Sequence, residues 1–219
     1  MFLAVLKKEY LTELRSKEAF SLVLSFQLLL ALVLGLSIES AYLDRSAIEK
    51  LFPALFYLIV VITAALGLSR TAESEFETGA ILGIAASSSS LAGYFLAKAL
   101  FGAVLLLISS SIGGFFLAIL LNTESSLFDT FYTLPVLCLG LSSILTLLSP
   151  LSFTSRLKGL ILPIIALPCA IPLFILSIEE TYRRINLTST GDSLLLPLAL
   201  FALVYTALGT RLFRSAVLG

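Results

Sequence analysis

The chain has 219 residues, of which 58% are hydrophobic and 13% are charged, and it contains neither histidine nor tryptophan. Soluble domains carry about 45–50% apolar and about 25% charged residues, so this composition predicts an integral membrane protein. The 14 Lys and Arg residues balance the 14 Asp and Glu residues, which argues against nucleic-acid binding because that function needs a concentrated basic surface. The lack of histidine, the commonest general base and metal ligand, makes hydrolytic or metal chemistry an unfavourable interpretation.

The first 18 residues predict an amphipathic helix ahead of the membrane domain. Phe2, Leu3, Leu6, Tyr10 and Leu14 recur at helical spacing, and the basic residues lie largely elsewhere around the helix. We expect residues 1–18 to form an interfacial helix in the cytoplasmic headgroup layer and residues 19–219 to form the membrane domain. A charged, membrane-skimming leader that sets the topology is at least as good an interpretation of this helix as a specific partner site.

Six apolar runs follow, each long enough to cross a membrane. A helix needs roughly 20 residues to cross a hydrocarbon core about 30 Å thick, because every backbone amide must be bonded internally. The predicted spans are residues 19–38, 52–69, 91–121, 131–150, 160–178 and 193–212. The predicted fold class is therefore an all-α integral membrane protein with six transmembrane helices.

The basic residues beside these spans predict their orientation, because cytoplasmic flanks are enriched in Lys and Arg. Ten of the 14 basic residues lie on the side of the N-terminus. These are Lys7, Lys8, Arg15, Lys17, Arg70, Lys98, Arg156, Lys158, Arg211 and Arg214. The opposite side has Arg45, Lys50, Arg183 and Arg184. Both termini are therefore predicted to be cytoplasmic.

Residues 70–90, between the second and third spans, are too many for a turn and too polar for a span. Glu73, Glu75 and Glu77 bring negative charge to the side where the topology rule favours positive charge. Together with Gly79 and the serine run after it, they predict a short, partly amphipathic cytoplasmic helix that ends in a flexible stretch. The simpler alternative is a solvated loop whose carboxylates keep it out of the bilayer.

The fifth span contains Pro163, Pro168 and Pro172. Each proline removes a backbone donor and pushes its ring toward an earlier carbonyl, so we expect this span to kink or unwind locally. Pro168 and Pro172 are four residues apart and occupy nearly one helix face, which favours a built-in bend. The three prolines are the candidate hinge.

Other polar and sulfur-containing residues within the spans predict packing rather than chemistry. The small residues from Ser109 to Gly114 favour close helix contacts, and Gln27 indicates another such contact. Cys138 and Cys169 are interpreted as small apolar groups. No predicted span has an Asp or Glu near its centre, which argues against a proton- or sodium-coupled transporter.

Two stretches of the chain carry a distinctive pattern of residues. The first runs from Leu68-Ser69-Arg70 through Glu75 to Gly79 and on to Leu96-Ala97-Lys98. The second is Leu157-Lys158-Gly159, followed by Leu167-Pro168 and Ile171-Pro172-Leu173. Both stretches resemble the cytochrome c maturation protein B (CcmB) family, the haem exporter B permeases within the second family of ABC-type exporters. The chain departs from the family pattern at Leu82, where a Glu is common, and at residues 85–88, where a proline-containing segment is common.

The resemblance implies a non-catalytic permease subunit of the bacterial inner membrane that acts in haem export and delivery for c-type cytochrome maturation. The chain has no phosphate-binding loop of the GxxxxGK[ST] type, so a separate ABC ATPase subunit would bind ATP. Residues 70–90 would be its coupling segment, with Glu73, Glu75 and Glu77 meeting basic residues of the ATPase and Gly79 allowing the turn. A haem-handling membrane subunit is the other implied partner, and a second copy of the chain is compatible with the family.

The same residues leave two alternatives open and assign no cofactor to this chain. Haem iron is usually held by His, Met, Cys or Tyr, but here histidine is absent and the only methionine is Met1. We therefore expect no cofactor-binding, metal or catalytic residue in this chain, and haem to be handled by another subunit. The alternatives are a related permease that exports a different lipophilic substrate or a polysaccharide, and a non-transporting membrane scaffold.

Overall fold

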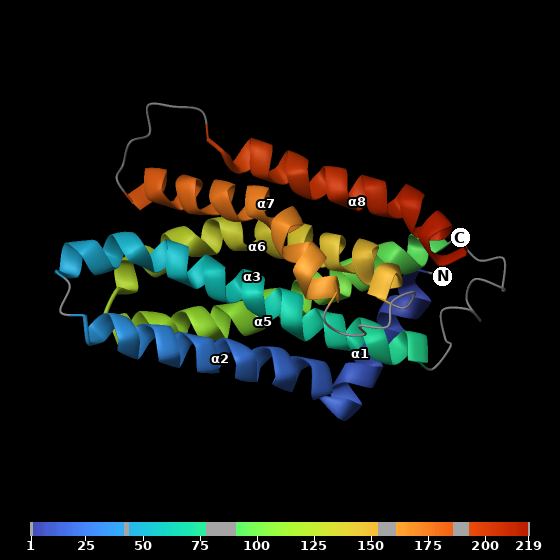
Figure 1. Cartoon of the computed structure of the whole chain (residues 1–219), viewed down its shortest axis with the longest axis horizontal. Coiled ribbons are helices and arrows are strands. Elements are labelled where there is room, and N and C mark those ends of the chain that lie inside the picture. Colours follow the sequence, from blue (N-terminus) through green and yellow to red (C-terminus); the bar gives the residue numbers. More distant parts are fainter. Residues whose placement is uncertain (1, 42–43, 78–90, 153–160, 186–192, 219) are drawn as a thin grey trace.

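The computed structural model describes residues 2–41, 44–77, 91–152, 161–185 and 193–218. Over these ranges the chain forms seven α-helices, one short 3-10 helix and no strand. The helices are α1 (Phe2–Ser16), α2 (Glu18–Glu39), α3 (Arg45–Glu77), α5 (Leu91–Leu121), α6 (Glu124–Leu148), η1 (Ser149–Ser152), α7 (Ile161–Ile185) and α8 (Leu195–Leu218) (Figure 1). The predicted all-α class is confirmed.

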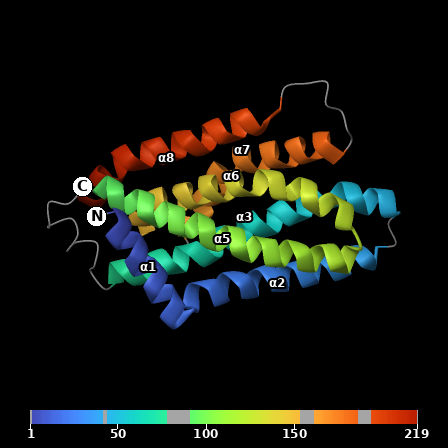
Figure 2. The ribbon, with the colours of Figure 1, turned by 180° about the vertical axis from the view of Figure 1, so that it is seen from behind.

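Six of these helices contain a segment long and apolar enough to cross a membrane. The segments are Glu18–Glu39, Arg45–Ser69, Leu91–Leu121, Leu127–Leu148, Ile161–Ile185 and Leu195–Phe213. Each of the six predicted spans therefore corresponds to one helix. The helices run up and down along the long axis of the bundle, and the even number of passes brings both termini to the same end (Figures 1 and 2).

Helix α6 lies inside the bundle, where it contacts α5, α7, α8 and α3. Leu134, Leu137 and Leu141 on α6 are each at most 2% exposed. The outer helices α2 and α8 instead expose large apolar side chains, such as Leu29 at 59% and Leu196 at 65%. Exposed apolar surface of this extent is costly in water, so these helices present the face that suits the hydrocarbon of a bilayer.

Small residues in the middle of α5 let neighbouring helices approach closely. A Cβ atom on Gly114 would lie 2.5 Å from the ring of Phe56, and one on Gly113 would lie 2.7 Å from Gln27 Cγ. Gln27 is buried on α2 and donates from Nε2 to Ser110 Oγ of α5 at 2.9 Å. The small residues and Gln27 therefore serve helix packing, as their sequence pattern predicted.

The N-terminal helix α1 joins α2 through a one-residue elbow. Lys17 has a left-handed backbone with φ 53° and ψ 16°, a conformation that residues other than glycine seldom adopt. The elbow is fixed by Glu13, whose Oε1 accepts the backbone N–H of Phe20 at 2.7 Å. As a result α1 lies across the end of the bundle rather than along it (Figures 1 and 2). The predicted N-terminal helix is present, and its position in the headgroup layer stays a prediction.

Candidate functional site

The acidic segment predicted to meet a partner begins on the same helix as the second span. Helix α3 has 33 residues, so it is about 50 Å long, whereas a hydrocarbon core is about 30 Å thick. The apolar span ends at Ser69, and the helix continues without a break to Glu77. The backbone of Glu73, Glu75 and Glu77 therefore extends the spanning helix, and Gly79 lies outside the described residues with the rest of 78–90.

Over residues 70–77 the chain therefore continues α3, and the rest of the predicted short cytoplasmic helix lies outside the described residues and stays a prediction. Between Ser69 and Glu77 the chain has neither glycine nor proline to end the helix. Alanine and three glutamates in this stretch are good helix formers. The helix of the second span therefore extends through the position where the sequence analysis placed a boundary.

The three candidate hinge prolines all lie in α7, but they occupy different kinds of position. Pro163 is in the first turn of the described helix, where a proline interrupts no internal hydrogen bond. Pro168 and Pro172 are inside α7 and each removes one bond of its ladder. The helix remains α-helical from Ile161 to Ile185 and bends in its N-terminal half (Figure 1). It therefore accommodates the prolines by bending rather than by unwinding.

A small apolar cavity lies beside this bend, between α7, α3 and α6. On α7 it is lined by Ala166, Leu167 and Ala170, the residues around Pro168. The facing residues on α3 and α6 are Val61, Ala65, Leu141, Ile144 and Leu145. An unfilled apolar space of this kind costs the folded state packing contacts.

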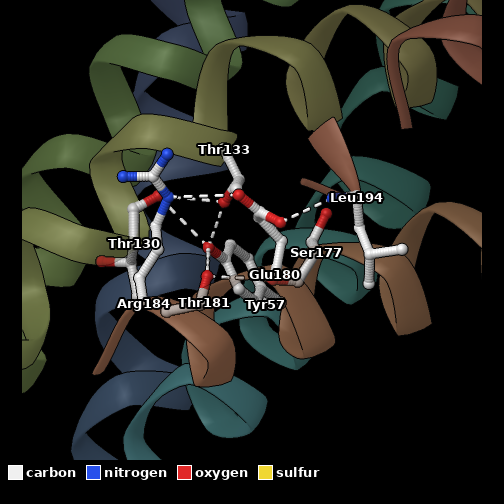
Figure 3. A network of polar contacts seen from close by, with 8 residues as sticks. All are labelled: Tyr57, Thr130, Thr133, Ser177, Glu180, Thr181, Arg184 and Leu194. Atoms are coloured by element: carbon white, nitrogen blue, oxygen red, sulfur yellow. Dashed lines mark hydrogen bonds and ion pairs between the residues drawn. The ribbon is translucent and has the colours of Figure 1, made fainter. Parts of the chain in front are cut away.

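A polar cluster that the sequence analysis did not identify joins α3, α6 and α7 near the end of the bundle away from the termini (Figure 3). Its centre is Tyr57 of α3, whose side chain is fully buried. The Tyr57 hydroxyl bonds to Thr181 Oγ1 of α7 at 2.7 Å and to Thr133 Oγ1 of α6, and it donates to the Thr130 carbonyl at 3.2 Å. One hydroxyl thus links three helices.

The two threonine hydroxyls of this cluster also have backbone partners in their own helices. Thr181 Oγ1 donates to the Ser177 carbonyl at 2.9 Å, and Thr133 Oγ1 reaches the Thr130 carbonyl at 3.3 Å. Because each threonine hydroxyl has one proton, a threonine that donates to its own backbone can only accept from Tyr57. We call Tyr57, Thr130, Thr133 and Thr181 the tyrosine cluster.

A buried carboxylate continues the cluster to α8. Glu180 is 3% exposed, and its Oε2 accepts the backbone N–H of Leu194, just before α8, at 2.8 Å. Its Oε1 pairs with Arg184 Nε at 3.2 Å, and the Arg184 guanidinium lies 3.5 Å from the centre of the Tyr132 ring on α6. Glu180 therefore accepts a backbone N–H at the start of α8, where such groups have no partner within the helix. The Arg184 guanidinium stacks on the Tyr132 ring, which connects the ion pair to α6.

The sequence holds a signal for this cluster that was not used. Thr130 and Thr133 are three residues apart, and Glu180 and Arg184 are four apart, so each pair shares one helix face. The fifth predicted span stopped at residue 178, which left Glu180 outside the helix, whereas α7 continues to Ile185. The helix extends because Glu179 and Glu180 pair with Arg183 and Arg184, each at 3.2 Å.

The comparisons with known proteins agree with this all-helical membrane architecture. A family model described as CcmB protein matches residues 1–217. The chain belongs to the CcmB family. The match covers nearly the whole chain, so it includes the acidic end of α3, the prolines of α7 and the tyrosine cluster. A search of curated proteins finds no match.

Membership of the CcmB family gives the chain its general role. The family comprises the membrane component of the haem exporter for cytochrome c maturation, which works in a complex with other Ccm subunits. This CcmB-family chain is thus a multi-pass membrane protein of a transporter permease family. In the part of the chain that the structure describes, no group of three or more Cys, Asp or Glu side chains could hold a metal ion.

Proposed function

We propose that this CcmB protein converts ATP hydrolysis by a separate ABC ATPase subunit into a rearrangement of its membrane helices during haem delivery for c-type cytochrome maturation. The observation that carries the proposal is the continuity of α3 from the apolar span through Ser69 to Glu77. A continuous helix moves as one stiff rod, so a displacement of its acidic end reaches the span directly. Residues 70–90 are proposed as the coupling segment, with Gly79 at a turn.

The charge of this segment supports a basic partner. Glu73, Glu75 and Glu77 lie at the end of the bundle that also holds both termini (Figure 1). We propose that this end is cytoplasmic, in the inner membrane of a bacterium, because ten of the 14 basic residues belong to it. Carboxylates on such an end suit a cytoplasmic surface with Lys or Arg side chains.

The tyrosine cluster supports a path for the movement within the membrane. Tyr57 lies on α3 between the acidic end and the opposite end of the helix, and it bonds to α6 and to α7. A shift of α3 therefore acts on α7, the helix that contains Pro168, Pro172 and the adjacent cavity. We propose that Pro163, Pro168 and Pro172 form the hinge region of α7, with the bend at Pro168 and Pro172.

The available side chains support assigning haem ligation to another subunit. Histidine is absent from the chain, Cys138 is fully buried in α6, and the Tyr57 hydroxyl is already bonded to its cluster. We therefore propose that haem is bound by a separate haem-handling membrane subunit and that this chain supplies movement. A haem titration of the purified subunit tests this point, because stoichiometric axial ligation would contradict it.

The proposal is tested by reversing charge at the end of α3. Glu75→Lys combined with Glu77→Lys should reduce co-purification of the ATPase and abolish covalent haem staining of c-type cytochromes. Glu39→Lys is the matched control, because it makes one such charge change at the end of α2 on the opposite side of the bundle. Unchanged ATPase binding and haem staining in the double variant would refute the coupling role of this segment.

A second variant separates binding of the ATPase from transmission of its movement along α3. Thr71→Gly combined with Ala72→Gly leaves the acidic residues in place but weakens the helix between them and the span by about 1 kcal/mol per glycine. We expect this variant to retain the ATPase and to lose haem staining. If staining were instead unaffected, α3 would not transmit the movement. A gene disruption that leaves c-type cytochromes intact would favour export of another lipophilic substrate or a polysaccharide.

A further inference from the structure

Helix α1 presents two exposed faces of different chemistry at the end of the bundle that holds the termini. Leu3, Tyr10 and Leu14, at positions i, i+7 and i+11, are 75%, 59% and 53% exposed. Lys8 and Arg15 are seven residues apart and so share another side of the helix. Lys7 lies at the edge between the two faces and is exposed. The apolar face and the basic face are therefore neighbours.

The acidic residues of α1 neutralise only part of its positive charge. Glu13 is used internally, because its Oε1 accepts the Phe20 N–H at 2.7 Å. Glu9 pairs with Lys8 at 3.3 Å. Over the residues that the structure describes, no ion pair is found for Lys7 and Arg15 of α1 or for Lys17 of the elbow. Lys7 and Arg15 are therefore the positive charges of α1 that an anionic partner can reach.

The two faces of α1 are held in a fixed direction by the rest of the chain. On the opposite side of α1, Val5 is 7% exposed and belongs to a core cluster with Phe95 of α5 and Phe213 of α8. At the other end of α1, the elbow at Lys17 is fixed by Glu13. Helix α1 lies across the end of the bundle (Figure 2), so its exposed faces are held beside the ends of the spanning helices.

We propose that the exposed faces of α1 form a binding surface for anionic phospholipids. Leu3 and Leu14 would enter the acyl region, and Tyr10 suits the boundary between apolar and polar layers. Lys7 and Arg15 would bind the phosphates, to which ammonium and guanidinium groups donate charge-assisted hydrogen bonds. The partner is a lipid rather than a soluble anion because the basic residues adjoin an apolar face that acyl chains can cover and a soluble anion cannot. The inference does not depend on how ATP hydrolysis is coupled.

The absence of tryptophan from the chain gives a direct experiment. Tyr10→Trp places a single fluorophore in the surface, and the full-length protein is reconstituted into phosphatidylcholine vesicles with about 20% phosphatidylglycerol. Bromine atoms, which quench tryptophan on contact, are placed on either the glycerol lipid or an equal amount of the choline lipid. Since each basic residue near the surface favours anionic lipid by about 1 kcal/mol, we expect local enrichment on the order of fivefold and stronger quenching by the brominated phosphatidylglycerol.

Three controls make the result specific. Phe115→Trp places the fluorophore on the exposed face of α5, where Phe115 is 58% exposed, and it should show equal quenching by the two lipids. In the Tyr10→Trp chain, Lys7→Gln with Arg15→Gln should remove the preference, whereas Lys7→Arg with Arg15→Lys should keep it. High salt should reduce the preference for brominated phosphatidylglycerol, because dissolved ions screen the attraction between surface charges.

Three results would overturn the proposal. Equal quenching of the Tyr10→Trp fluorophore by both brominated lipids would show a membrane contact without selection for anionic lipid. Absence of quenching by either lipid, while the Phe115→Trp fluorophore is quenched, would show that protein or water covers α1. A preference that survives the Lys7→Gln and Arg15→Gln changes would reject the assignment to these side chains.

Discussion

Replacing Tyr57 with phenylalanine removes one hydroxyl from the contact between α3, α6 and α7 and leaves the ring in place. The change deletes the bonds to Thr133 and Thr181 and the bond to the Thr130 carbonyl. Both threonine hydroxyls keep a backbone partner, because Thr181 still donates to the Ser177 carbonyl and Thr133 still reaches the Thr130 carbonyl. The variant therefore loses hydrogen bonds between helices without leaving these hydroxyls unpartnered.

The expected loss of stability follows from these contacts. A hydrogen bond between membrane helices contributes about 0.6 kcal/mol on average and at most about 1.7 kcal/mol. Since one hydroxyl serves two helices besides its own, we expect Tyr57→Phe to lower the free energy of unfolding by about 1–2 kcal/mol. Tyr205→Phe is the matched control, because its hydroxyl makes one bond, to the Cys169 carbonyl at 3.1 Å, and should cost about 0.6 kcal/mol.

Reversible unfolding of the purified subunit in mixed detergent micelles measures these differences. A double-mutant cycle with Thr181→Val isolates the bond between α3 and α7, and we expect a coupling energy of about 0.5 kcal/mol or more. If Tyr57→Phe costs no more than Tyr205→Phe and shows no coupling to Thr181→Val, the tyrosine cluster does not hold these helices together. The proposed transmission from α3 to α7 would then lose its support.

Three further changes have defined outcomes. Gly209→Ala should lower the free energy of unfolding by about 1–3 kcal/mol, because the added Cβ would lie 1.9 Å from Phe95 Cζ. Phe95→Leu in the same chain should restore part of this free energy, and unfolding measurements would detect both changes. Glu180→Ala should cost about 3–5 kcal/mol, since it removes the partner of Arg184 and of the Leu194 N–H, whereas Glu180→Gln keeps one acceptor and should cost less. Lys17→Gly should raise the thermal midpoint, because the left-handed backbone at φ 53° costs a lysine about 1–2 kcal/mol that glycine avoids; a lower midpoint would contradict that reasoning.

The membrane helices were predictable because each one is determined by the residues of its own segment. A run of about 20 apolar residues satisfies the length and the hydrogen bonding of a span regardless of its neighbours. The third predicted span, residues 91–121, therefore coincides with helix α5, Leu91–Leu121. Two helices continue into polar sequence beyond the predicted spans, after Ser69 and after residue 178. Hydropathy falls at these positions, but helix propensity and i,i+4 ion pairs sustain the helix.

The tyrosine cluster could not be predicted in the same way, because its partners are distant in sequence. Tyr57 meets Thr133 and Thr181 only after three helices have packed, and a lone tyrosine in an apolar run carries no indication of its partners. By contrast, Pro168 and Pro172 were found because a proline acts on its own helix. The roles of the acidic residues of α3 and of the prolines stay predictions, since both concern a movement and a partner.

The turn between α5 and α6 has a consequence for how the protein enters the membrane during synthesis. Only Asn122 and Thr123 separate the two helices. Asn122 adopts φ 52°, and the Thr123 N–H bonds back to the Ala118 carbonyl at 3.0 Å, an arrangement that closes a helix end tightly. Two such helices cannot be placed in the bilayer far apart. As soon as α6 is in the bilayer it therefore has α5 beside it, whether or not α7 and α8 have been inserted.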